Sequence, residues 1–143
     1  MNRFRFPLQK VRDFRRRQLE AEEALLEALH TEREALVAES AHLESDAAQT
    51  RVSLMVTGVA EAQDLVASDL YLRHLSAGRK RLAARLADWQ ARAGRQRLAV
   101  VEARRRVRLL DKLEDRKLRA WQKGVDCEQE NLASELYLAR WKR

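Results

Sequence analysis

The side chains that most often carry chemistry are sparse in this chain and are not grouped. Histidine occurs three times, at His30, His42 and His74, and no two of them are four residues apart, as a helical pair of metal ligands would be. Cys127 is the one cysteine, so it has no partner for an internal disulfide or a zinc site. The sequence has no Gly-rich phosphate loop and no nucleophile motif. It therefore predicts a protein that is not an enzyme, with no catalytic residue, metal or cofactor.

Basic stretches offer a second kind of chemistry, the binding of phosphates or membranes. The apolar residues Phe4, Leu8, Val11 and Phe14 recur at helical spacing within MNRFRFPLQKVRDFRRR, which holds seven bases. This pattern fits an interfacial membrane helix, a transit peptide (less well, because serine is absent) or the start of a coiled-coil seam, which we favour. The run at 104–106 could bind nucleic acid, but its arginines are also suited to pair with acids elsewhere in the chain.

Composition points to long helices rather than a compact domain. The 143 residues include four glycines and one proline, and 36% are charged. So few chain breakers among many Ala, Leu, Glu and Arg residues are typical of a long helix or coiled coil. No apolar run approaches the ~20 residues of a membrane span, and no signal-peptide pattern is present, so we expect a cytosolic protein without a membrane span.

Charge is divided along the chain. Residues 1–17 hold seven bases and one acid, residues 18–72 hold twelve acids and two bases, and residues 73–143 hold twenty bases and nine acids. The net charge of +7 thus hides an acidic first half and a basic second half. The two halves would attract each other if the chain folded back on itself.

Heptad periodicity supports that arrangement. An apolar seam with steps of three and four residues runs through the second half, and comprises Leu82, Leu86, Trp89, Ala93, Gln96, Val100, Ala103, Val107 and Leu110. The first half carries two seven-residue ladders, Leu29, Leu36 and Leu43 in one, and Leu19, Leu26, Ala47 and Leu54 in the other. Arg33 and Ser40 interrupt the second ladder, as residues that set register do.

Poor helix formers mark the break between the halves. They cluster around Gly58 in SLMVTGVAEA, with Gly78 as the competing position. We predict an all-α fold: one long antiparallel two-helix coiled coil, or helical hairpin, over residues 1–143, monomeric when isolated. Its helices would cover about 7–56 and 63–139 and its tip 57–62. Pairing from Gly58 would exhaust the first helix near residue 112, leaving the remainder of the second helix unpaired.

Two surfaces of this hairpin exceed what a seam needs. QTRVSLMV and DLYLRHL are rich in apolar residues, and Tyr71, Leu75 and Leu82 form a stripe that is core by default but near the tip could contact a partner. At the other end, in LLDKLEDRKLRAW, we expect Leu110 and Leu113 to be buried opposite Leu8 and Val11. The basic set there would crowd like charges unless an acidic partner is near: Arg12, Arg15, Arg16, Lys112, Arg116 and Lys117.

Motifs spread over nearly the whole chain resemble the FliJ family of flagellar export proteins. They comprise Phe6, Leu8, Gln9 and Val11; the mid-chain LYLRHL; Leu110, Lys112, Leu113, Arg116 and Lys117; and Glu130, Leu132, Glu135 and Arg140. Trp121 departs from the family, in which a tyrosine is more usual nearby. The resemblance implies a coiled coil similar to the central stalk of rotary ATPases, cytoplasmic and peripheral at the inner membrane.

The partners that the resemblance implies are the export ATPase hexamer, the cytoplasmic domain of the export gate and export chaperones, in bacterial flagellum biogenesis and motility. The basic set would then contact the ATPase, and Tyr71, Leu75 and Leu82 the gate. The equivalent stalk of a virulence type III secretion system is the alternative. A dimeric nucleic-acid-binding coiled coil and a membrane-surface protein are rivals of other classes, although we expect no nucleic acid partner.

Overall fold

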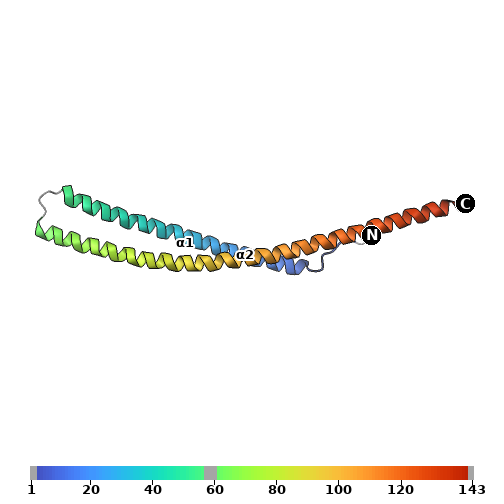
Figure 1. The fold of residues 1–143 in the computed structure, drawn as a ribbon, viewed down its shortest axis with the longest axis horizontal. Helices are drawn as coiled ribbons and strands as arrows, with labels where there is room; N and C mark the ends of the chain where they lie inside the picture. Colours follow the sequence, from blue (N-terminus) through green and yellow to red (C-terminus); the bar gives the residue numbers. More distant parts are fainter. Residues whose placement is uncertain (1–2, 57–60, 142–143) are drawn as a thin grey trace. The chain divides into compact units, whose positions relative to one another are not determined.

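The computed structural model describes residues 3–56 and 61–141. It contains two long helices packed against each other, α1 (Gln9–Val56) and α2 (Ala62–Trp141), of 48 and 80 residues (Figure 1). The described residues contain no strand. The all-α class and the two long helices are thus confirmed. None of the described helices is long and apolar enough to cross a membrane.

Helix starts follow local backbone chemistry. Pro7 lies just before α1, where the Leu8 carbonyl accepts from the Arg12 amide at 2.9 Å. The Glu61 carbonyl accepts from the amides of Asp64 and Leu65 where α2 begins. Asp64 lies in the first turn of α2, a place that favours a negative side chain. Of the predicted tip, 57–60 lies outside the described residues, whereas Gly78, the competing break, lies within α2.

Contacts divide the chain into two compact units. One comprises Glu23–Ala99, and the other comprises the residues up to Glu22 together with those from Val100 onward. Each unit therefore contains a part of α1 and a part of α2.

The core of the 23–99 unit is a cluster of buried side chains drawn from both helices. Leu36, which is 1% exposed, is buried with Leu82, Trp89 and Ala93. Leu29, Leu43 and Leu86 pack against this cluster. The ladder of the first half and the seam of the second half are therefore the surfaces that meet, because apolar residues at steps of three and four lie on one face of a helix.

Contacts between the helices follow one order in this unit. Glu32 pairs with Arg92, Glu39 with Arg85, and Leu43 lies 3.5 Å from the position of a Cβ added at Gly78. Residue numbers rise along α1 as they fall along α2. The acidic first half thus pairs with the basic second half, as the charge division indicated.

The other unit continues the seam with Val100 and Val107, both buried, and with the half-buried Ala103 and Leu110. Beyond Val107 the face of α2 toward α1 changes character. Residues at steps of four and three become Asp111, Glu114, Leu118, Trp121 and Val125. Polar and aromatic contacts accordingly replace the aliphatic seam there.

Candidate functional site

Two of the six residues of the basic set are engaged in ion pairs across the helices. Arg12 pairs with Glu114, and Arg16 donates to the Asp111 carboxylate at 3.1 Å. The expectation that like charges crowd here is therefore wrong at these two positions. The expectation considered the bases of the segment and left out its acids, which the helical period directs at α1.

Arg12 is the most enclosed member of the basic set. Its side chain is 11% exposed, and its guanidinium lies 5.8 Å from the centroid of the buried Phe6 ring. Gln9 accepts a hydrogen bond from Arg12 Nη2 at 2.8 Å, and Nε has no hydrogen-bond partner in the described structure. Because loss of Glu114 would leave this enclosed guanidinium without its partner, the Arg12–Glu114 pair stabilises the fold.

The remaining four bases are more open to partners. Arg15 is half-buried, donates to Gln18 at 2.8 Å and lies over the Phe14 ring. Lys112, Arg116 and Lys117 are exposed and form no ion pair within the residues that the structure describes. These three cations are available to an anionic surface of another protein.

Pairing extends further than residue 112, where it was expected to end. The ring centroids of Phe4 and Trp121 lie 6.0 Å apart, and Phe6 is buried although it precedes α1. Leu110 and Leu113, which were expected to be buried, are half-buried, as is Leu8, and Val11 is exposed. The expected end was wrong because the aromatic residues before the helix also pack, and because the partners lie further along α2 than pairing from Gly58 implied.

Past Trp121 the helix α2 presents side chains on all sides. Every described residue from 122 to 141 is exposed except the half-buried Val125. Five large apolar side chains are among them: Leu132, Leu136, Tyr137, Leu138 and Trp141. Such a concentration of exposed apolar area is typical of a surface that contacts another protein.

The stripe predicted to contact the gate is divided between core and surface. Leu75 and Leu82 are buried, and Leu82 belongs to the core cluster, whereas Tyr71 is 43% exposed. Of these three residues, Tyr71 alone is accessible in the described structure. The apolar surplus of the sequence is instead exposed at the facing helix ends, at Val52, Met55 and Val56 of α1 and at Leu65, Val66 and Leu70 of α2.

Salt bridges and a groove occur together in the middle of the 23–99 unit. Arg92 holds Glu32 through two hydrogen bonds, one of them 2.9 Å, and this lowers the pKa of Glu32 below its ordinary value. These hydrogen bonds to Glu32, with another that Arg92 Nε donates to the Asp88 carboxylate at 2.9 Å, raise the pKa of Arg92 above its ordinary value. These charge-assisted bonds set which residues face each other across the helices.

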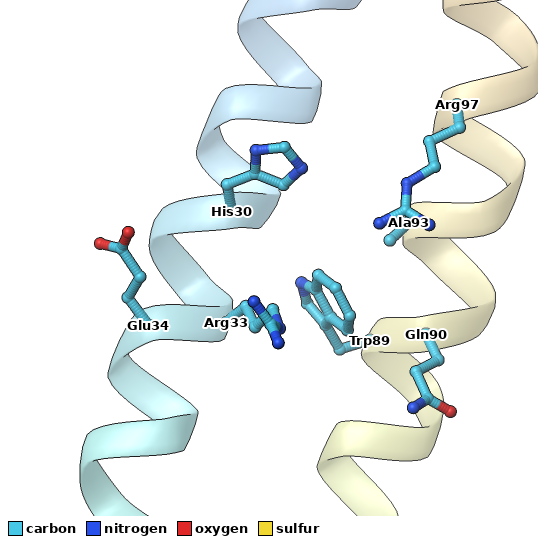
Figure 2. A pocket seen from close by; sticks show the side chains of 7 residues that line it. All are labelled: His30, Arg33, Glu34, Trp89, Gln90, Ala93 and Arg97. Atoms are coloured by element: carbon cyan, nitrogen blue, oxygen red, sulfur yellow. The ribbon is translucent and has the colours of Figure 1, made fainter.

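The groove, here called the Trp89 groove, has a volume of about 610 Å³ and lies between the two helices (Figure 2). Its lining includes His30 and Arg33 from α1 and Trp89, Ala93 and Arg97 from α2. The indole N–H of Trp89 donates to the Leu29 carbonyl at 2.6 Å, which holds the ring between the helices. The sequence placed Trp89 in the seam and Arg33 as an interruption, but did not show that they meet.

The described residues offer few groups for metal binding or redox chemistry. No three His, Cys, Asp or Glu side chains there are placed to hold a metal ion, and Cys127 is an exposed free thiol. The groups that the described surfaces do present are charges, aromatic rings and apolar side chains.

Comparison with protein-family models, curated proteins and solved structures found no match. The resemblance to flagellar export proteins accordingly stays a prediction that rests on the motif residues of this chain.

Proposed function

We propose that the protein is a cytoplasmic stalk and adaptor of the flagellar type III export apparatus, peripheral to the inner membrane. It would link the export ATPase hexamer to the cytoplasmic domain of the export gate and escort export chaperones. In this proposal it is a monomeric antiparallel coiled coil, acts mechanically or allosterically, and needs no catalytic residue or cofactor.

The observation that carries the proposal is the exposed stretch of α2 beyond Trp121. A helix of 80 residues against one of 48 leaves a single-helix extension, and this extension carries Leu132, Leu136 and Trp141 in exposed positions. A helix that inserts into a ring of ATPase subunits needs contact residues around its circumference. The apolar side chains of the extension meet that need on more than one face.

Exposed basic residues beside the extension also support an ATPase contact there. Lys112, Arg116 and Lys117 are exposed without ion pairs in the described structure, next to the extension. An anionic collar within the hexamer would bind them, and the attraction would weaken as salt is added. Arg12 and Arg16 contribute less directly, since Glu114 and Asp111 already pair with them.

The gate contact is proposed for the 23–99 unit, around Tyr71. Its exposed ring lies on the part of α2 that also exposes Leu65, Val66 and Leu70. Aromatic and aliphatic side chains of this kind form the centre of protein interfaces.

The experiment is to measure binding to the purified export ATPase and stimulation of its ATP hydrolysis. Arg116→Glu with Lys117→Glu should weaken both by about tenfold or more, which corresponds to about 1.4 kcal/mol. The helicity and thermal midpoint of the isolated protein should stay near wild type, because both side chains are exposed and unpaired.

The matched control is Arg79→Glu with Lys80→Glu, an Arg–Lys pair that is also exposed on α2. This control changes net charge equally and should leave ATPase binding within about twofold of wild type. Equal losses in both variants, or no complex with the wild-type protein, would refute the proposed function.

A further inference from the structure

The Trp89 groove arises because the seam is not filled by bulky aliphatic residues at this level. Arg33 occupies a position in the leucine ladder of α1, and Ala93 occupies a seam position of α2. Neither residue supplies a large apolar side chain between the helices. Trp89 fills part of the space and forms an apolar floor with Ala93, and the remainder is open to solvent.

Cationic side chains from both helices border this floor. Arg33 of α1 lies over the Trp89 ring, with its Cζ atom 5.8 Å from the ring centroid. Arg97 of α2 extends along the groove toward Ala93, and His30 lies on the opposite wall (Figure 2). Glu34 also lines the groove but points away from its centre (Figure 2). The interior of the groove is therefore electropositive.

Arg33 and Arg97 differ from the neighbouring arginines of the same unit. Arg85 and Arg92 reach across the helices and pair with Glu39 and Glu32. Neither Arg33 nor Arg97 forms an ion pair with the described residues, although the chain is rich in acids. Two guanidinium groups without an ion pair in the described structure therefore face one groove.

The walls favour a carboxylate carried on a polypeptide over a free small anion. Both walls are formed by residues in the middle of a helix, far from its ends. The backbone N–H groups there are bonded within the helix and cannot form an anion-binding nest. A free anion would be held only by flexible side chains. An acidic side chain of a partner segment gains the same two guanidinium contacts, and an adjacent apolar side chain can cover the floor of Trp89 and Ala93.

We propose that the Trp89 groove is a docking site for an acidic segment of another protein, with an Asp or Glu carboxylate bound between Arg33 and Arg97 and a neighbouring apolar side chain over Trp89. The site shares no residue with the basic set or with the C-terminal extension of α2. It does not rest on the export function, and it would hold for any partner with this chemistry.

The test uses the full chain with Trp121→Phe and Trp141→Phe, so that tryptophan emission reports on Trp89 alone. The probe is a synthetic amphipathic peptide in which Glu and Leu recur at helical spacing. We expect a saturable change in emission that weakens with added salt. Arg33→Ala with Arg97→Ala should weaken binding about tenfold while helicity is retained, because both side chains lie at the open edge of the groove.

A matched control separates the groove from general charge. Arg81→Ala with Arg95→Ala removes two exposed arginines of α2 outside the groove and should bind the peptide as the parent does. A peptide with Gln in place of Glu should bind at least about tenfold more weakly.

Three results would overturn the proposal. The first is an equal loss of binding in the Arg81 and Arg95 control. The second is an emission change of the same size and affinity with inorganic phosphate alone, which would make the groove a small-anion site. The third is a concentration-dependent dimer of this chain that the Arg33 and Arg97 substitutions abolish, which would assign the groove to a second copy.

Discussion

Leu75 and Tyr71 are one helical turn apart, yet their truncation should have very different consequences. Leu75 is 4% exposed, whereas Tyr71 is 43% exposed. Leu→Ala changes in protein cores cost about 2–5 kcal/mol. We expect Leu75→Ala to cost about 2–3 kcal/mol, the low part of that range, because two packed helices can close around a cavity more easily than a thick core can.

Tyr71→Ala should cost less than about 1 kcal/mol, because half-exposed contacts contribute little and alanine favours the helix. Thermal unfolding followed by far-ultraviolet circular dichroism measures both changes. At about 3–5 °C per kcal/mol for a chain of this size, Leu75→Ala should lower the midpoint by about 6–15 °C. A Leu75→Ala midpoint within about 2 °C of wild type would refute the reasoning, because the side chain would then not be core.

Three further substitutions test individual contacts. Glu32→Gln should destabilise the protein at neutral pH, because the hydrogen bond from Arg92 favours the carboxylate. The destabilisation should shrink as the pH falls through the lowered pKa of Glu32, and thermal midpoints measured across that pH range check this. Glu114→Gln should cost about 1–3 kcal/mol in urea unfolding, because it weakens the partner of the enclosed Arg12 guanidinium. Gly94→Ala should raise the thermal midpoint through a stabilisation of about 0.5–1 kcal/mol, because no atom beyond its chain neighbours and the backbone of its own helical turns lies within 4 Å of the added Cβ.

Each of these three predictions has a result that would contradict it or a control that sharpens it. A Glu32→Gln deficit that stays constant down to acid pH would show that the carboxylate charge is not what Arg92 recognises. Asp111→Asn is the control for Glu114→Gln and should cost less than about 1 kcal/mol, since its pair with Arg16 is exposed. A lower midpoint for Gly94→Ala would mean that another surface covers this position.

The helix pair was predictable because its signals are local and repeated. Apolar residues at steps of three and four identified the buried faces, from Leu36 on α1 to Val107 on α2. The clustering of poor helix formers near Gly58 placed the break between α1 and α2. The opposite charges of the halves indicated which surfaces attract.

The candidate sites were less predictable because they depend on the exact register between the helices. A shift of a few residues decides whether Asp111 and Glu114 meet Arg16 and Arg12, and no periodicity within one helix reports that shift. The stepwise spacing of 107, 111, 114 and 118 was the signal that could have identified these acids as facing residues. The Trp89 groove likewise needed the register that brings Arg33 over the indole ring.

The measurement that tests the proposed function most directly is the stoichiometry of the complex between this protein and the purified export ATPase, determined by mass in solution. A stalk that inserts its single-helix extension into a ring predicts one chain per hexamer, with the complex lost when residues 122–141 are removed. Several chains per hexamer, or undiminished binding after this truncation, would contradict the account.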